Sequence, residues 1–420
     1  MMTPRTLAFT ALRSVREDDA FVNLLLPRLI KENALEPRDA ALATELTHGT
    51  IRRQGTYDAI IDSLAARDVD PAVRDALRLG VHQVLSMRVP DHAALKTTGD
   101  LVRREIGHKP VGFVNALLRR ISQKSLEQWI EVLSRDLDAV GALALRYSHP
   151  CWIVDELTAA VGEAEVEALL AADNEAPKVT LVARPGLADS SELPGTPGRW
   201  SPFAKVLDSG DPGAIAAVRQ GRAAVQDEGS QLVALTLAQV SIEGHDTNWL
   251  DVCAGPGGKA ALLGAIAAGR GASVVANEVQ HHRADLVRQS VRALRNVSVT
   301  EFDGREGPWE EESFDRILLD APCTGLGALR RRPEVRWRRT RDHLTELIEL
   351  QTALLRRSLD LVRPGGVVGY ATCSPLLPET DAVVASVVHE RMDVEVVSTH
   401  RWWPHLHGTD AMYLAIVRKH

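Results

Sequence analysis

The chain has 420 residues, of which 45% are hydrophobic and 25% are charged, and its formal net charge is −7. This length corresponds to two or three domains, and the composition excludes extensive disorder. The negative charge argues against a protein that binds nucleic acid by bulk electrostatics. No apolar run reaches the ~18–20 residues of a membrane span, and the first residues do not form a secretory signal, so we expect a cytoplasmic protein.

Residues 1–140 carry apolar side chains at helical spacing, such as Leu7, Ala11 and Val15. The pair Asp70-Pro71 is typical of a helix start, in which an N-cap residue precedes a proline in the first turn. Because no alternating strand pattern occurs in this stretch, we expect residues 1–140 to form an all-α domain.

Residues 141–240 have a mixed pattern. We expect a helix over 153–171, a strand over 178–184, a loop rich in Gly, Pro and Ser over 186–212, a short strand over 222–226 and a helix from Ser230. This stretch is predicted to be a small α/β connector.

Residues 241–420 alternate between apolar β-type runs and helical patterns. The expected strands cover 249–253, 273–276, 297–302, 314–319 and 366–370, and two late strands cover 394–397 and 412–417. Alternation of this kind is typical of an α/β fold with a doubly wound, mostly parallel sheet, similar to a Rossmann fold.

The first of these strands leads through a glycine-rich turn into a helix. The turn consists of Cys253, Ala254, Gly255, Pro256, Gly257, Gly258 and Lys259. Glycines let the backbone approach a ligand, and the start of the helix offers unpaired N–H groups. Glu278 follows the second strand, where an acid can bind ribose hydroxyls, and Asp303 follows the third, where an adenine amino group is expected. The glycine spacing matches neither the dinucleotide fingerprint nor the P-loop, so S-adenosylmethionine is the predicted cofactor and a nicotinamide dehydrogenase is the weaker alternative.

Two cysteines follow neighbouring strands. Cys323 comes shortly after Asp320 at the end of the fourth strand, and Cys373 comes at the end of the fifth. Central strands of a doubly wound sheet end at one crevice, so we expect both thiols and Asp320 to lie beside the cofactor. A single cysteine is more often a small buried hydrophobe than a nucleophile, but two thiols with a carboxylate favour a catalytic role.

These motifs together resemble the NOL1/NOP2/Sun family of RNA cytosine-C5 methyltransferases. The matching stretches are 225–230, 251–259, 320–325, 330–337 and 372–374. Thr324 stands where the family usually has Ser or Ala, and residues 408–413 match only loosely. Stretches 38–40, 45–49, 77–83 and 112–120 resemble a NusB-type RNA-binding domain, a combination that is similar to the bacterial branch acting on small-subunit (16S) ribosomal RNA.

The resemblance implies S-adenosylmethionine-dependent methylation of cytosine C5. It implies that Cys373 adds to C6 of the base, that Cys323 removes the C5 proton and that Asp320 binds N3. Cys253 is expected to pack or touch the cofactor without reacting. The expected partner is 16S rRNA, with no metal and no membrane, and the chain is expected to act as a monomer. A tRNA cytosine-C5 methyltransferase and an inactive rRNA-binding assembly factor are the alternatives.

A cluster of seven arginines and one acid lies between residues 330 and 341. Such clusters are most often solvated faces. Its position after Cys323 favours an RNA-contacting strip, with Arg330 and Arg331 nearest the predicted crevice in sequence.

Overall fold

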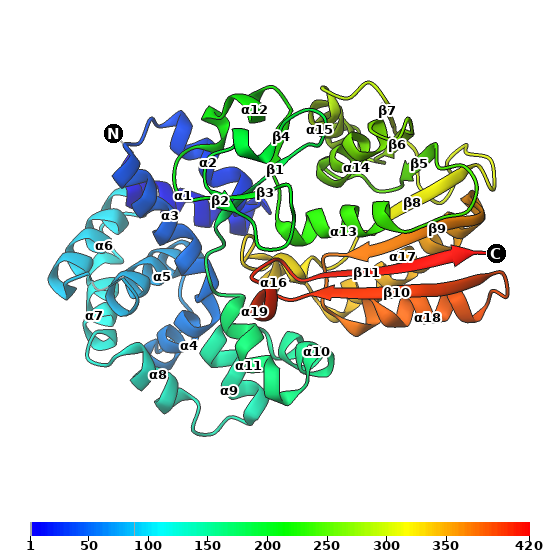
Figure 1. Ribbon diagram of the computed structural model, residues 1–420. Helices are drawn as coiled ribbons and strands as arrows, with labels where there is room; N and C mark the ends of the chain where they lie inside the picture. The colour runs from blue at the N-terminus through cyan, green and yellow to red at the C-terminus, as the bar shows by residue number, and fades with distance from the viewer. Residues whose placement is uncertain (1, 88) are drawn as a thin grey trace. The chain divides into compact units, whose positions relative to one another are not determined.

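The structure is a computed structural model that describes residues 2–87 and 89–420. By their contacts the residues fall into two compact units (Figure 1). The first comprises Met1–Glu175 and Leu329–Arg338, and the second comprises Ala176–Ala328 and Arg339–His420. The division falls inside the stretch expected to be a connector. Its helices up to Ala172 belong to the first unit, whereas its strands and the helix that begins at Glu228 belong to the second.

The first unit is helical. Its helices are α1 (Pro4–Glu17), α2 (Val22–Glu32), α3 (Pro37–Arg52), α4 (Gln54–Leu64), α5 (Pro71–Leu85), α6 (Asp91–Glu105), α7 (Val111–Ile121), α8 (Leu126–Leu133), α9 (Ala139–Tyr147), α10 (Cys151–Val161), α11 (Glu163–Ala172) and the short α16 (Val335–Arg338). The all-α prediction for residues 1–140 is therefore confirmed across the described residues of that stretch. Asp70 caps α5 as expected, since its carboxylate accepts the N–H groups of Ala72 and Val73. The single helix predicted over 153–171 is instead two helices that meet at Gly162.

The segment Leu329–Arg338 packs into the first unit, although the chain on either side of it belongs to the second. The side chain of Arg336 is fully buried and donates hydrogen bonds to the carbonyl of Ser148 (3.0 Å) and to Oδ1 of Asn174 (2.9 Å). Arg330 is also buried, and its carbonyl accepts a bond from Arg52 (3.0 Å). The prediction of an RNA-contacting strip is therefore wrong for Arg336, because its buried guanidinium bonds to protein oxygens and does not face a phosphate. For Arg330, burial of the side chain argues against a phosphate contact. The contact predicted for Arg331 stays a prediction.

A small antiparallel sheet begins the second unit. Its order is β2 (Thr196–Pro197), β3 (Ala204–Leu207), β1 (Val179–Ala183) and β4 (Ala223–Val225). β1 and β4 confirm the two strands expected here. The loop predicted over 186–212 is wrong in part, because β2 and β3 lie within it. Both strands are short and lie in a stretch rich in Gly and Pro. The extended conformation of β3 is stabilised by its pairing with β1, in which Val182 lies opposite Ala204.

The main sheet has seven strands in the order β10-β11-β9-β8-β5-β6-β7. Their bounds are β5 (Asn248–Asp251), β6 (Ser273–Asn277), β7 (Val297–Thr300), β8 (Phe314–Asp320), β9 (Val362–Thr372), β10 (Val394–Trp402) and β11 (Met412–Lys419). Strands β5 to β9 pair in parallel, whereas β10 and β11 pair antiparallel. The doubly wound, mostly parallel sheet predicted from the sequence is confirmed.

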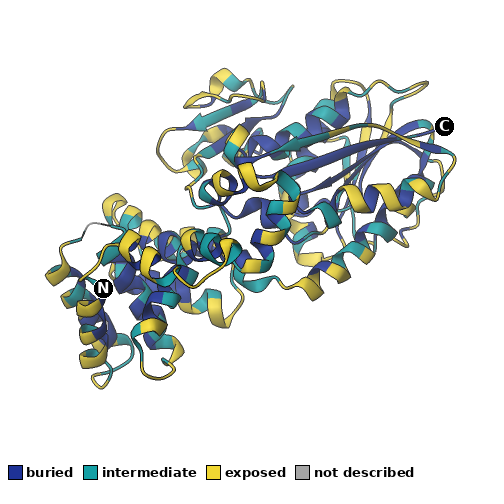
Figure 2. Ribbon diagram, turned by 90° about the horizontal axis from the view of Figure 1, so that it is seen from below, coloured by how far each residue is buried: buried dark blue, intermediate teal, exposed yellow. Residues whose placement is uncertain are grey.

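Helices cover both faces of this sheet. They are α13 (Glu228–Gln239), α14 (Gly258–Ala268) and α15 (His281–Val291) on one side and α17 (Arg341–Leu361) and α18 (Asp381–His389) on the other. Figure 1 shows β9, β11 and β10 side by side, with α13 and α18 on opposite sides of them. Ile317 and Leu319 of β8 pack in the cluster of α17 and α18, while Leu318 packs in that of α13 and α14. The central strands β8, β9 and β11 are accordingly buried over most of their length, and central strands appear dark blue in Figure 2. The edge strands β7 and β10 are mostly half-buried or exposed.

We predict that Arg336→Ala destabilises the protein by on the order of 3 kcal/mol, because it leaves buried carbonyl and amide oxygens without their donor. A lower urea midpoint measured by circular dichroism checks this. The control is Arg119→Ala, which removes an exposed guanidinium and is expected to stay within about 0.5 kcal/mol of the parent. An Arg336→Ala protein as stable as the control contradicts the structural role.

Candidate active site

The site is built where parallel strands β5 and β8 and the long β9 end. In the β8–β9 pairing Asp320 lies opposite Ala371, and in the β5–β8 pairing Asp251 lies opposite Leu318. The residues that follow each strand therefore emerge at the same edge of the sheet.

The two cysteines expected at this edge lie next to each other. The Sγ atoms of Cys323 and Cys373 are 3.4 Å apart, and both residues are half-buried. The sulfur–sulfur hydrogen bond, together with burial, raises the pKa of Cys323 well above the usual value for a thiol. Cys323 is therefore a protonated thiol at neutral pH.

Lys259 and Asp320 form an ion pair beside these thiols. Nζ of Lys259 lies 2.8 Å from Oδ2 of Asp320. Burial of Lys259 acts to lower its pKa, but the charge and hydrogen bond of Asp320 and the nearby Cys373 outweigh burial, so the pKa is raised. Lys259 is therefore a fixed cation close to Cys373, and a neighbouring cation favours a thiolate.

Buried polar atoms without hydrogen-bond partners lie in and beside the glycine-rich turn. Gly257 has a φ of 87°, and a side chain there would collide with the backbone of Val287. Among the described residues, neither carboxylate oxygen of the buried Asp251 nor either amide atom of the buried Gln226 has a hydrogen-bond partner. Burial raises the pKa of Asp251 to about 8. In addition, no side chain caps the N-terminus of α14. Buried polar groups without partners and an uncapped helix start fit a polar ligand such as the amino-acid end of S-adenosylmethionine.

The two acids predicted to bind the nucleoside follow their strands as expected. Glu278 comes directly after β6, is 4% exposed and accepts the N–H of Gln280 (3.0 Å). Asp303 comes after β7, and the guanidinium of Arg305 covers its carboxylate, with a closest distance of 2.6 Å. That contact lowers the pKa of Asp303. Roles for Glu278 and Asp303 in binding the cofactor stay predictions.

Cys253 lies in the turn, and burial raises its pKa well above the usual value for a thiol. A protonated thiol in this place suits packing against a ligand better than nucleophilic attack. All four cysteines of the chain, each within the described residues, are thiols and not disulfides.

A buried acid that was not predicted from the sequence lies next to the thiols. Glu379 is fully buried and accepts hydrogen bonds from both Thr324 and Ser374, the residues that follow the two cysteines. The only signal in the sequence is one acid after an apolar Pro-Leu-Leu-Pro run, which also fits a helix start.

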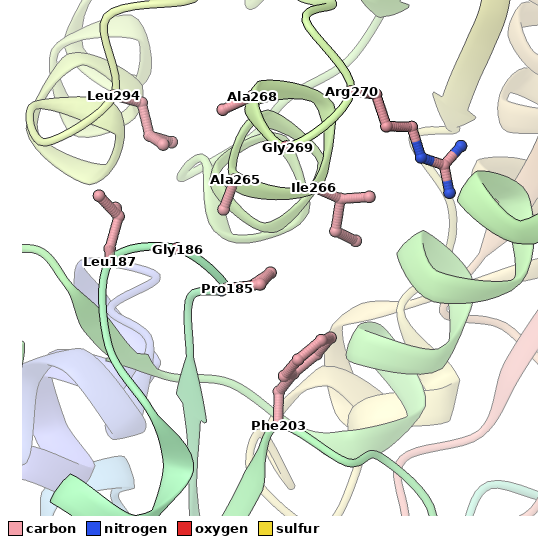
Figure 3. A pocket seen from close by; sticks show the side chains of 10 residues that line it. All are labelled: Pro185, Gly186, Leu187, Phe203, Ala265, Ile266, Ala268, Gly269, Arg270 and Leu294. Carbon is pink, nitrogen blue, oxygen red and sulfur yellow. The ribbon is translucent and has the colours of Figure 1, made fainter.

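A pocket of about 550 Å³ lies elsewhere in the second unit, against α14 (Figure 3). Its walls are mostly apolar, formed by residues such as Leu187, Phe203 and Ile266, and it contains none of the candidate site residues. Across residues 2–87 and 89–420 no group of three or more His, Cys, Asp or Glu side chains is placed to hold a metal ion. The same residues contain no helix with the length and hydrophobicity needed to cross a membrane.

Comparison with known proteins identifies relatives along almost the whole chain. Residues 237–418 match the family described as 16S rRNA methyltransferase RsmB/F, and residues 2–123 match the NusB family. A putative methyltransferase of Mycobacterium tuberculosis is 47% identical, covering 99% of this chain and 96% of that protein. A probable ribosomal RNA small subunit methyltransferase B of Bacillus subtilis is 30% identical, covering 99% of this chain and 98% of that protein.

The crystal structure of the protein PH0851 has the same fold. It is 22% identical, with a TM-score of 0.83 over 100% of this chain and 99% of its own. Because the matched family is one of methyltransferases, S-adenosylmethionine is confirmed as the expected cofactor. The glycine-rich turn, the two thiols and the full-length relatives lead to one assignment: the chain belongs to the RsmB/F family of 16S rRNA methyltransferases, with a NusB-family domain at its N-terminus.

Proposed function

We propose that this protein methylates C5 of a cytosine in 16S ribosomal RNA through a covalent adduct of Cys373 with the base. The observation that carries the proposal is the pair of sulfur atoms 3.4 Å apart beside the Lys259–Asp320 ion pair. The names of the relatives support 16S rRNA as the substrate, and the NusB-family domain supports RNA binding.

The chemistry of cytosine explains why a thiol is needed. C5 is too weak a nucleophile to take a methyl group directly. When a thiolate adds to C6, an S–C bond forms and the electrons of the C5=C6 bond move toward C5, which becomes nucleophilic. S-Adenosylmethionine, when bound, supplies an electrophilic methyl group. Loss of the C5 proton then re-forms the C5=C6 bond and expels the thiolate.

Cys373 is the thiol best placed to attack. Lys259 provides a positive charge near its sulfur, and the sulfur of Cys323, which can donate a hydrogen bond to it, lies 3.4 Å away. Both contacts favour the thiolate form of Cys373. Cys323 holds its own proton because the neighbouring sulfur raises its pKa.

The same contact explains how Cys323 acts later in the reaction. Once Cys373 is bonded to C6 it is a neutral thioether, so the main cause that raises the pKa of Cys323 is removed. Cys323 then loses its proton to solvent more readily, and the resulting thiolate can accept the proton from C5.

Asp320 is the group proposed to hold the base. Within the described residues its hydrogen-bond partner is Lys259, on Oδ2, which leaves Oδ1 for N3 of cytosine. Both Oδ1 and N3 are hydrogen-bond acceptors, so this contact requires a proton on either the carboxyl group or the base. A base in a duplex is out of reach of these groups, so we infer a single-stranded or flipped target nucleotide.

We predict that Glu278→Ala weakens binding of S-adenosylmethionine roughly 10- to 150-fold, because a buried carboxylate that bonds the ribose hydroxyls contributes about 1.5–3 kcal/mol. Isothermal titration calorimetry measures the dissociation constant. Glu306→Ala, which removes an exposed carboxylate from the same domain, serves as the control and is expected to bind like the parent. An unchanged constant in Glu278→Ala refutes the ribose contact.

The roles of the two thiols can be distinguished by whether each alanine variant forms a covalent adduct with RNA. Cys373→Ala is expected to abolish turnover and any covalent RNA–protein species, since no sulfur adds to C6. Cys323→Ala is expected to add and methylate but to stall before elimination, so that an adduct accumulates. Denaturing gels after single-turnover incubation with RNA and cofactor measure this.

Cys151→Ala, which removes an exposed thiol in the first unit, is the control and should behave like the parent. The double variant Cys323→Ala/Cys373→Ala should resemble Cys373→Ala. An adduct that persists in Cys373→Ala and vanishes in Cys323→Ala reverses the two roles.

A further inference from the structure

Glu379 is a buried carboxylate that lies outside the reacting groups. It ends the short 3-10 helix η4 (Leu377–Glu379) and has no exposed surface. Four donors converge on its two oxygens. Oε1 accepts the backbone N–H of Thr324 (2.8 Å) and Nε2 of Gln351 (3.0 Å), and Oε2 accepts the hydroxyls of Thr324 (2.5 Å) and Ser374.

These donors come from both cysteine loops. Thr324 follows Cys323 directly, and Ser374 follows Cys373 directly. One carboxylate therefore joins two segments that are fifty residues apart in the chain. The two hydroxyls also lie 3.2 Å from each other, so the three side chains form one closed network.

The network is itself anchored to the sheet and to α17. Tyr370 of β9 donates its hydroxyl proton to the carbonyl of Glu379 (2.7 Å), and Gln351 of α17 also donates to the carbonyl of Pro322 (2.8 Å). The backbone of Gly327 also links the two cysteine loops, because its N–H donates a hydrogen bond to the carbonyl of Cys373 (2.9 Å). A Cβ at Gly327 would lie 2.8 Å from that same oxygen.

We propose that Glu379 is a positioning residue that sets the separation of the Cys323 and Cys373 sulfurs without touching substrate or cofactor. The proposal rests on the proposed function for its consequence: C5 and C6 are neighbouring atoms of one ring, so the group that attacks C6 and the group that deprotonates C5 must be held close together. Fixed geometry of this kind is what makes successive steps at adjacent atoms efficient. Loosening it harms elimination by Cys323 more than addition by Cys373.

Three substitutions test the network at different points. Glu379→Gln keeps the shape but weakens the bonds to both loops. Thr324→Val keeps the backbone N–H contact and the side-chain shape but removes one hydroxyl, and Thr324→Ser restores that hydroxyl. Glu390→Gln makes the same chemical change at an exposed carboxylate paired with Arg356 and is the matched control.

The first measurement needs neither RNA nor cofactor. Each protein is equilibrated with reduced and oxidised glutathione, and the fraction of Cys323–Cys373 disulfide gives the effective concentration of the two thiols. In this exchange the two protein thiols are oxidised and one glutathione disulfide is reduced to two glutathione molecules. We expect Glu379→Gln and Thr324→Val to lower the effective concentration at least 10-fold, with Thr324→Ser and Glu390→Gln unchanged. Equal values for all variants overturn the proposal.

The second measurement follows adduct formation and release in single turnovers. Glu379→Gln is expected to form the adduct within about threefold of the parent rate but to release it at least 10-fold more slowly. In a Cys323→Ala background Glu379→Gln should slow release no further, because the residue acts through Cys323. A general loss of structure would lower both rates and give no accumulated adduct.

The two measurements separate the two proposals. If no protein forms an adduct while the glutathione values change as expected, the proposed function fails and the positioning role of Glu379 stands. If adducts form as expected while Glu379→Gln and Thr324→Val match the parent in both assays, the positioning role fails and the proposed function stands.

Discussion

The parallel pairing of β8 with β9 is the constraint on which the candidate site depends. Because Asp320 lies opposite Ala371 in this pairing, the loops that follow the two strands leave the sheet at the same place. The two sulfurs meet at 3.4 Å as a direct result of that register. A shift of register by one residue would send the side chains of β9 to the opposite face and separate the thiols.

Buried polar groups then turn this proximity into a defined arrangement. Lys259 reaches across from α14 to Asp320, and Glu379 takes hydrogen bonds from both cysteine loops. Such groups are costly to bury unless they are paired, so each bond that satisfies them also fixes a loop. The glycine-rich turn differs, because the buried side chains of Asp251 and Gln226 have no hydrogen-bond partners among the described residues. A cofactor fits there because it brings the missing partners.

The sequence predicted the site because its signals are local and tied to topology. Strand ends followed by Cys323 and Cys373 are enough to place two thiols at one crevice once the sheet is known to be parallel. Glu379 was not predicted as part of the site. Its partners are the residues next to the two cysteines, and a single acid beside a helix start does not indicate which residues it contacts. Arg336 was misjudged for the opposite reason: a run of arginines is typical of a surface, yet here one is buried among the carbonyls of helix ends. β3 was missed because its partner strand, not its own short sequence, determines its conformation.

Cytosine methylation of 16S rRNA at C5 is the central claim, and bisulfite sequencing tests it most directly. The method reads C5-methylated cytosines as those that resist deamination, in rRNA and tRNA from cells that contain the protein, cells that lack it and cells that carry Cys373→Ala. We expect one 16S cytosine to be resistant only in cells with the unaltered protein, with tRNA unchanged in all three. An identical 16S pattern in all three, alongside a tRNA cytosine that loses its resistance, would contradict it.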